Sequence, residues 1–379
     1  MPKYDYIIIG AGASGLLLAD AMGKNAFFAK KSILIIDKAT KKTNDRTWCF
    51  WEEGDGDFES ILHKTWSKIS FAGQELRKSY EIAPYQYKMV QGIDFYNHYL
   101  VKLEQFSNIT LINDEVVSVK DNDKNAVVIT KKETYKTLQV FNSVFSYEHL
   151  KQDQKYPILQ QHFLGWFVNT ERPIFKKDEA TFMDFSIPQK ENTRFMYVLP
   201  FSENKALVEY TLFSEKPLDK SEYEEAIKLY LEDKNSGDYT ILETEKGNIP
   251  MTCYNFQQHN SEHIFNIGTA GGWAKASTGY TFMKTNKNIK ALIGHLTKGK
   301  HAIDFSAKNR FWYYDLLLLD ILHRNNKLGR SIFESLFKKR SPKLIFKFLD
   351  EETSILEDVK IMMAPKPLPF IKALFQRVF

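Results

Sequence analysis

The hydrophobic residues near the start of the chain have the spacing of a strand, a helix and a second strand. Apolar runs at residues 6–9 and 32–36 are short and nearly continuous, as in buried parallel strands, and residues 16–22 between them have helical character. A β-α-β unit of this size places its two strands side by side in a parallel sheet. The chain is therefore expected to begin with an α/β unit.

The pattern then changes to a helix with short strands, and later to strands separated by turns. Residues 92–106 place Phe95, Tyr99, Leu103 and Phe106 on one helical face. Strands are expected at 109–112, 115–119, 126–130 and 138–147, the middle ones as a β-meander inserted in the same domain. An antiparallel sheet is expected from strands at 161–170, 180–187, 194–201 and 206–213, with a hairpin turn at 202–205.

The last third of the chain returns to a mixed and then a helical pattern. A helix is expected at 220–232, a short strand at 264–268 and a helix opening at Gly279. From Arg310 the chain is expected to be mostly helical, with an extended Pro-rich segment at 364–369.

A glycine motif joins the first strand to the first helix. Residues 10–15 read Gly-Ala-Gly-Ala-Ser-Gly, which matches GxGxxG. In this setting Gly10 permits the tight turn, Gly12 lets the backbone approach a pyrophosphate, and Gly15 allows close helix–strand packing. Asp37 follows at the end of the second strand, where a carboxylate can accept hydrogen bonds from ribose hydroxyls. Together these features predict a dinucleotide site rather than a structural turn.

A second glycine cluster indicates which dinucleotide is bound. Residues 268–272 read Gly-Thr-Ala-Gly-Gly, and Gly279 follows; the stretch again joins a strand to a helix. In large flavoproteins such a late strand returns to the N-terminal unit and places backbone N–H groups near the flavin. The two clusters together favour FAD. The expected cofactor contacts are Gly10, Gly12, Ala13, Gly15, Asp37, Arg46, Gly268, Gly271, Gly272 and Gly279.

The domain organisation and fold class follow from these patterns. We expect an α/β chain with a FAD-binding Rossmann-type flavoprotein domain, an antiparallel-sheet substrate domain and a helical C-terminal region. The expected segments are 1–155 for the first part of the FAD-binding domain, 156–260 for the substrate domain, 261–305 for the return to the FAD-binding domain, and 306–379 for the helical region.

Composition and charge exclude several other classes. The net charge of +5 is too small to argue for nucleic acid, and no nucleic-acid-binding motif is present. Cys49 and Cys253 lie far apart, and no cysteine or histidine spacing predicts a metal site. With 29 Phe, 19 Tyr and 6 Trp, the chain has enough rings to line a large apolar cavity, although the same rings could fill a core.

One C-terminal stretch indicates contact with a membrane surface. Residues 324–347 carry eight basic residues and one acid, Glu334, among many Phe, Leu and Ile residues. Such a segment can lie on anionic lipid headgroups, or it can be an ordinary solvated helix face. The apolar run at 316–322 is broken by Asp320 and is too short to span a bilayer. We expect a cytoplasmic protein without a signal peptide, peripherally associated with the inner face of the membrane.

Several segments, in order along the chain, match one pattern: residues 7–19, 45–51, 182–184, 197–202, 206–211, 247–251, 268–282 and 361–367. Together they resemble one family, the FAD-dependent lycopene cyclases of bacteria, which are related to the plant enzymes. The resemblance implies a redox-neutral cyclisation of linear lycopene, or a related linear carotenoid, to a carotene with β-ionone rings. It also implies that FAD is active in its reduced form and that NAD(P)H is the reductant.

Glu209 is the expected proton donor of this chemistry. Cyclisation of a polyene begins when a proton adds to its terminal double bond, so the site needs a neutral carboxylic acid. Glu209 lies in a predicted strand whose alternate residues Leu207, Thr211 and Phe213 share its face. Burial on such a face raises the pKa of a carboxyl and keeps it protonated. An ordinary surface or ion-paired glutamate is the alternative, and the resemblance favours the catalytic role.

Other residues have less specific roles. Asp184, among Phe182, Met183 and Phe185, is expected in a strand beside that of Glu209, where it could orient Glu209 or relay a proton, or act only as a buried structural acid. Arg46 is expected at the cofactor's phosphates or flavin edge, with an ion pair to Asp45 as the plainer alternative. The candidate rings for cation–π contact are Trp48, Phe50, Trp51 and Trp273, each of which could also be core.

Two other functions stay open at this point. A FAD-dependent monooxygenase or an isoprenoid reductase acting on an apolar substrate could use a similar scaffold but would consume NAD(P)H in each turnover. A non-catalytic carotenoid or lipid carrier could retain FAD for structure and would be indifferent to the loss of Glu209.

Overall fold

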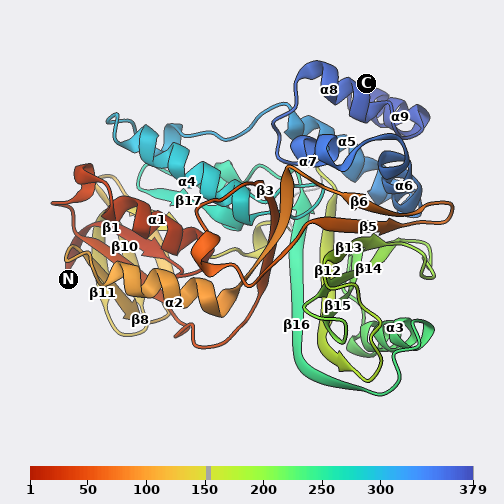
Figure 1. Cartoon of the computed structure of the whole chain (residues 1–379). Helices are drawn as coiled ribbons and strands as arrows, with labels where there is room; N and C mark the ends of the chain where they lie inside the picture. The colour runs from red at the N-terminus through yellow and green to blue at the C-terminus, as the bar shows by residue number, and fades with distance from the viewer. Residues whose placement is uncertain (151–154, 379) are drawn as a thin grey trace.

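The N-terminal β-α-β unit forms the centre of the first sheet, at the left of Figure 1. The computed structural model describes residues 1–150 and 155–378. β1 (Lys3–Ile9) lies between β2 (Ile33–Asp37) and β11 (Thr134–Asn142), parallel to both. The sheet order is β8-β2-β1-β11-β10-β9, and β17 (Ile264–Asn266) pairs in parallel with β11. The remaining strands are β8 (Ile109–Asn113), β9 (Val116–Asn122) and β10 (Asn125–Thr130).

Three helices cover this sheet with an apolar core. α1 (Ala13–Gly23) packs against α2 (Gly92–Leu103) and α4 (Phe282–Leu296). Leu16, Phe95 and Ile289, one from each helix, are buried in the same cluster as Ile8 and Ile35 of the sheet. The return of β17 and α4 to the N-terminal unit confirms the Rossmann-type arrangement expected from the two glycine clusters.

The second sheet is long, mostly antiparallel and covered on both faces (Figure 1). Its order is β16-β12-β15-β14-β13-β5-β6. α3 (Lys220–Asp233) packs against β12 and β15 on one face. α5 (Phe311–Arg324) contacts β12 and β16, and α6 (Leu328–Lys339) contacts β14. The strands are β5 (Lys68–Ala72), β6 (Arg77–Glu81), β12 (Ile158–Thr170), β13 (Glu179–Asp184), β14 (Thr193–Pro200), β15 (Lys205–Ser214) and β16 (Tyr239–Thr252).

The alternation of residues along β15 divides the core into two. Leu207 and Phe213 belong to the large cluster that includes residues of α5, α6 and α7 (Pro342–Leu349). Val208, Tyr210 and Leu212 belong to the cluster packed against α3. The even positions therefore face α3, and the odd positions, including 209, face the opposite side.

Smaller elements connect these parts. β3 (Thr47–Glu53), β7 (Tyr85–Gln91) and β4 (Lys64–Trp66) form a three-stranded sheet. The C-terminal helices are α8 (Ile355–Met362) and α9 (Pro367–Val378). Short 3-10 helices occupy Ala26–Phe28, Glu59–Ile61, Tyr147–Leu150, Phe256–His259, Gly268–Gly271 and Ala302–Asp304.

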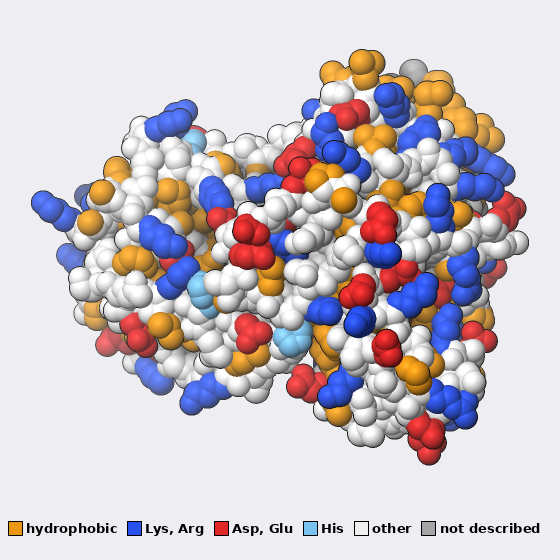
Figure 2. All heavy atoms as spheres, viewed as in Figure 1, with side chains coloured by type: hydrophobic (Ala, Val, Ile, Leu, Met, Phe, Trp, Pro, Cys, Tyr) orange, Lys and Arg blue, Asp and Glu red, His pale blue; other side chains and the backbone are white. Residues whose placement is uncertain are grey.

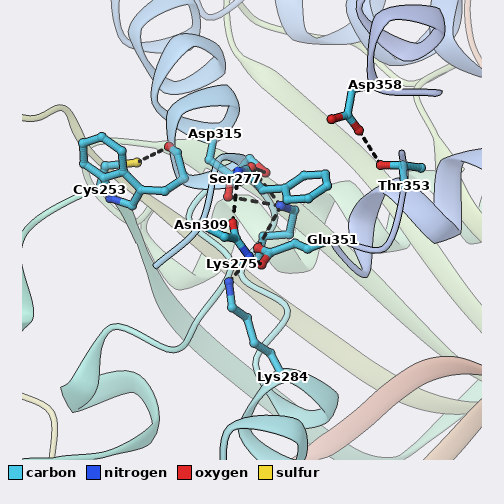
Figure 3. Close-up of polar contacts among 11 residues, drawn as sticks. Cys253, Lys275, Ser277, Lys284, Asn309, Asp315, Glu351, Thr353 and Asp358 are labelled. Atoms are coloured by element: carbon cyan, nitrogen blue, oxygen red, sulfur yellow. Dashed lines mark hydrogen bonds and ion pairs between the residues drawn. The ribbon is translucent and has the colours of Figure 1, made fainter. Parts of the chain in front are cut away.

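A buried ion cluster holds the loop before α4 against the C-terminal helices (Figure 3). The Lys275 ammonium lies 3.0 Å from a carboxylate oxygen of Asp315 on α5 and 3.4 Å from Glu351 after α7. Ser277 donates a 2.7 Å hydrogen bond to Asp315. Removal of one partner from such a buried pair costs about 3–5 kcal/mol, because a charge is left uncompensated. The cluster thereby fixes the loop that leads to Gly279 and Tyr280.

Several expected elements are wrong in extent. The strand expected at 138–147 is β11, which begins at Thr134 and ends at Asn142. The segment expected to be extended at 364–369 enters α9 at Pro367, and the helix expected from Gly279 begins at Phe282. β5 and β6 join the second sheet, although the segment expected as FAD-binding includes them. The sequence pattern also missed β16 and the three-stranded sheet.

Candidate active site

A cavity of about 580 Å³ lies where the first glycine loop meets the second sheet. Its wall includes Gly12, Ala13 and Ser14 from the loop, and Glu209 and Glu245 from the sheet. Residues from β3, β7 and the loop before α4 complete it, so the second and third sheets, the first glycine loop and the returning segment contribute. This cavity therefore joins the predicted cofactor site to the predicted acid.

The first glycine motif has the geometry of a dinucleotide loop. A Cβ atom at Gly15 would lie 1.8 Å from the carbonyl oxygen of Gly10, so the helix and the strand pack together only with glycine there. At Gly12 an added Cβ would meet no atom within 4 Å, although this residue lines the cavity. The backbone at Gly12 thus faces open space of the kind that a pyrophosphate needs.

The second glycine cluster packs closely against the first glycine loop. Gly268 has φ +60°, and a Cβ there would lie 2.0 Å from Ser14 Oγ. Gly271 and Gly272 pack in the same way against Asn266 and Phe256, so the structure gives these three glycines close-packing roles outside the cavity wall. Gly279 does line the cavity.

Of the two charged residues expected at the cofactor, Arg46 lines the cavity and Asp37 does not. Asp37 accepts hydrogen bonds from the backbone N–H groups of Ala11, at 2.6 Å, and Ala39, at 2.7 Å. It therefore supports the glycine loop and is not among the residues that line the cavity. Arg46 lines the cavity and also lies 3.2 Å from Asp45, with 56% of its side chain exposed. The ion pair to Asp45 is thus present, and contact of Arg46 with the cofactor stays a prediction.

Three buried oxygen atoms of the cavity-lining residues lack a hydrogen-bond partner within the described part of the chain. They belong to Gln161, Thr278 and Thr285. A buried polar atom without a partner costs about 1–3 kcal/mol, so such atoms indicate a polar ligand. With the open space at Gly12, they make the cavity a good fit for a dinucleotide, which carries many hydrogen-bonding groups.

Glu209 is buried and points into the cavity from the middle of β15. Only 7% of the residue is exposed, and Leu207, Thr211 and Phe213 line the cavity with it. Burial raises the pKa of its carboxyl to about 8, the nearby Glu245 adds to the rise, and the hydroxyl of Thr211 opposes it. At neutral pH the group is therefore mostly the neutral acid that was expected from the strand pattern.

A row of four residues crosses four strands at this point. Tyr197 on β14 pairs with Glu209, Glu209 pairs with Gly165 on β12, and Gly165 pairs with Glu245 on β16. Directly paired residues project from the same face of a sheet. Tyr197, Glu209 and Glu245 therefore share one face of the sheet. Gly165 has no side chain, and the space above it is filled by its neighbours, since a Cβ there would lie 2.8 Å from Leu207 and 3.4 Å from Glu209.

Tyrosines and a cysteine form the wall near Glu209. The hydroxyls of Tyr87 and Tyr197 lie 2.6 Å apart, and burial holds the pKa of both phenols well above the usual range. Burial also raises the pKa of the Cys49 thiol. These groups are neutral at any pH near 7, so they offer aromatic faces and O–H groups to a ligand without a competing charge.

Asp184 does not lie where the sequence pattern predicted. β14 lies between its strand and that of Glu209, so the two strands are not neighbours. A β-bulge between Thr181 and Asp184 turns its carboxylate toward α3, where it accepts hydrogen bonds from Tyr230 at 3.0 Å and from the backbone N–H of Ser186 at 2.9 Å. Asp184 is thus a buried acid with its own partners, and the structure does not bring it to Glu209.

The four candidate rings have different positions. Trp48 lines the cavity and stacks on Phe282 with 5.0 Å between ring centroids. Phe50 and Trp51 line a separate crevice of about 320 Å³, and Trp273 is buried in the core of the first sheet. Only Trp48 of this group therefore reaches the cavity.

Sequence reasoning missed Glu245, Tyr87 and Tyr197 as site residues. Tyr197 begins a segment that was recognised, and Glu245 stands two positions before another, at 247–251. Strand pairing brings Tyr197 and Glu245 to the side of Glu209, and the hydroxyl of Tyr87, from the three-stranded sheet, lies 2.6 Å from that of Tyr197. The places of Tyr197 and Glu245 in or near recognised segments were the available signals.

Solved structures with this fold include enzymes of several kinds. The chain matches a geranylgeranyl bacteriochlorophyll reductase-like protein from Thermoplasma acidophilum with a TM-score of 0.61 at 13% identity, over 98% of each chain. It matches p-nitrophenol 4-monooxygenase from Pseudomonas putida at 0.60 and 11%, over 98% of this chain and 99% of that chain. The flavin-dependent brominase Bmp2 matches at 0.58 and 13%, over 99% of each. The chain thus has the α/β fold of FAD-dependent oxidoreductases and halogenases.

The sequence itself defines the family within this fold. The model of the family described as lycopene cyclase protein matches residues 5–375. No curated protein sequence matches the chain significantly. The protein belongs to the lycopene cyclase family, as its recognised segments predicted.

Proposed function

We propose that the protein is a lycopene β-cyclase that binds FAD and closes the ends of linear lycopene into β-ionone rings without net redox change. The observation that carries this proposal is Glu209, a buried carboxyl with a pKa of about 8 on the wall of an aromatic cavity that reaches the glycine loop. A neutral acid facing an apolar space is what protonation of a terminal double bond requires.

The residues that would hold FAD are those whose open backbone or unpartnered atoms face the cavity. The open face of Gly12 and the neighbouring Ala13 suit the pyrophosphate at the start of α1, and Arg46 adds a positive charge. Thr278 and Gly279 extend the same wall toward Glu209. When bound and kept reduced by NAD(P)H, FAD supplies negative charge near the cation that forms on the substrate.

The chain's own groups account for the acid chemistry and for protection of the cation. The O–H group of Glu209 gives its proton to the terminal carbon–carbon double bond. The resulting cation is attacked by a second double bond, and the ring closes. Faces of Tyr197 and Tyr87 are each able to stabilise a nearby cation by about 0.5–2 kcal/mol. Apolar walls at Leu207 and Phe213 keep water from quenching it.

We also propose that the protein meets the membrane through α8 and α9. Figure 2 shows hydrophobic atoms gathered at the upper right, over these helices. Within residues 359–377 the only charged residues are Lys360, Lys366, Lys372 and Arg377, all basic. The two acids of α8 are paired, Glu357 with Lys347 and the buried Asp358 with Arg310. An apolar face flanked by basic residues suits an anionic lipid surface, where a polyene substrate dissolves. We call this surface the C-terminal apolar face; its exposed residues are Ile355, Leu356, Val359, Met362, Met363, Leu368, Ile371, Leu374 and Phe375.

Membrane contact by the basic segment at 324–347 stays a prediction, and its apolar residues lie inward. Its apolar residues Phe333, Phe337 and Phe346 are buried in the core. Lys339 donates a 2.7 Å hydrogen bond to the carbonyl of Ala364, and Arg340 donates one of 2.6 Å to the carbonyl of Lys360. These side chains therefore support the end of α8 and the turn into α9. Within the described residues, no helix has the length and apolar character to cross a bilayer.

The proposal is tested by expressing the chain in a bacterium that accumulates lycopene and separating the pigments by chromatography. Conversion to a cyclic carotene of unchanged mass supports the cyclase. A product heavier by oxygen or by hydrogen would instead indicate a monooxygenase or a reductase, and unchanged lycopene would argue for a carrier.

A further inference from the structure

Glu245 is a second buried carboxyl in the same cavity. It is 8% exposed, lines the cavity and stands in register with Gly165 and Glu209. Neighbouring strands lie about 4.8 Å apart, so the backbones at 209 and 245 are roughly 10 Å apart with one glycine between them. Because both residues line the same cavity, the end of a substrate bound there could touch both acids.

The two carboxyl groups differ in their partners. Both oxygens of Glu245 accept hydrogen bonds from Thr47, one from the backbone N–H at 2.8 Å and one from the hydroxyl at 2.6 Å. The guanidinium of Arg46 also favours the charged form of Glu245, against the effect of burial, which raises its pKa. Glu209 accepts one hydrogen bond, from Thr211. Two acids close together favour one proton between them, and the carboxyl whose charged form accepts more hydrogen bonds gives it up first.

We propose that Glu245 is the base that removes the ring proton in the proposed cyclisation. The inference rests on the proposed function, because only a cyclisation needs a proton to be removed after one has been added. Glu209 and Glu245 then have separate roles in one turnover, an acid and a base on one face of the sheet.

In the proposed step Glu209 gives one proton and Glu245 takes one, so the number of protons is balanced. The O–H bond of Glu209 breaks and a C–H bond forms at the terminal double bond. A carbon–carbon bond closes the ring, and a ring C–H bond next to the cation then breaks. Its proton goes to the Glu245 carboxylate, and its electron pair forms the ring double bond. Glu245 then releases this proton to solvent and Glu209 takes up a proton from solvent, which restores the site.

The test compares Glu245→Gln and Glu245→Asp with Glu243→Gln, an exposed position on the same strand. Each FAD-loaded enzyme is given lycopene in liposomes with chemically reduced flavin, and the products are separated by ring type. Glu245→Gln is expected to slow turnover by roughly a hundredfold or more while keeping its flavin. Its residual products should include rings with a displaced double bond, because the cation loses a proton elsewhere. Glu245→Asp should recover part of the rate, and Glu243→Gln should behave as the unchanged enzyme.

The inference would be overturned if Glu245→Gln kept a rate within about twofold of the unchanged enzyme with the same ring type. It would equally fail if both Glu245 variants lost flavin together with activity, because Glu245 would then be a structural residue. If the unchanged enzyme forms no cyclic product, the proposed function has failed rather than the role of Glu245.

Discussion

Thr211 donates a 2.6 Å hydrogen bond to a carboxyl oxygen of Glu209, two positions away on the same face of β15. The bond favours the charged form and so opposes the rise in the pKa of Glu209 that burial causes. Thr211 therefore sets how far above neutrality the acid stays protonated. The first prediction follows from this pair.

Cyclisation should fall as the pH rises through about 8, because Glu209 is active only with its proton. Thr211→Val should move this fall to higher pH, since loss of the hydroxyl removes a contact that lowers the pKa. The pH dependence of kcat measures the shift, and Thr240→Val, an exposed position on β16, is the control. An unchanged midpoint in Thr211→Val would show that Glu209 does not set the pH limit.

Glu209→Gln should change how stability depends on pH. The folded carboxyl has a pKa of about 8 and the unfolded one 4.5. Between these values the folded state holds a proton that the unfolded state releases, so stability is greatest below the lower pKa and falls as the pH rises. The loss is about 1.4 kcal/mol per pH unit. Glu209→Gln removes this loss of stability with rising pH, because glutamine does not titrate.

Urea unfolding of both proteins at several pH values between about 5 and 8 measures this difference. Compared with the unchanged protein, the variant should become relatively more stable as the pH rises. Glu104→Gln, at an exposed position at the end of α2, should show no such trend. Parallel stability curves for Glu209→Gln and the unchanged protein would mean that the carboxyl is not buried in a proton-bound form.

Gly12→Val should abolish flavin retention and leave the fold intact. A Cβ at Gly12 meets no protein atom within 4 Å, so the side chain fits the chain itself and fills only the space that a pyrophosphate needs. Absorbance of the purified protein measures bound flavin, and circular dichroism measures the fold. Gly294→Val, at another open glycine, should stay yellow. A yellow Gly12→Val protein would remove the proposed role of the loop.

Charges placed on the C-terminal apolar face should release the protein from anionic vesicles. Met363→Glu combined with Leu368→Glu puts two carboxylates where 68% and 74% of the residues are exposed. Sedimentation with anionic phospholipid vesicles should weaken by roughly tenfold or more. Leu229→Glu, at a similarly exposed position on α3, is the control. Equal sedimentation of all three proteins would exclude this face as the membrane-contacting surface.

Local signals in the sequence were sufficient for the first sheet and for Glu209. GxGxxG, the strand before it and Asp37 specify a short-range unit, and the two-residue period of a strand places position 209 on the same face as Leu207, Thr211 and Phe213. Both signals lie within about 40 residues of chain, so no distant pairing had to be known.

The positions of Asp184 and Glu245 could not be predicted from the sequence, because both depend on pairing between strands that are distant in the chain. The bulge that turns Asp184 toward α3 depends on how β13 meets β5 and β14. Glu245 lies in β16, whose residues 240–244 are all exposed, so no alternation marks the strand. Its place opposite Glu209 exists only because β12 pairs with both strands.

The most direct test of the account is anaerobic conversion of lycopene by the FAD-loaded enzyme in H₂O and in D₂O, with the flavin reduced beforehand. The account predicts cyclic product of unchanged mass in H₂O, product in D₂O with one deuterium for each ring formed, no consumption of reductant, and no product from Glu209→Gln that still holds FAD. Cyclic product without deuterium, or full activity in Glu209→Gln, would contradict it.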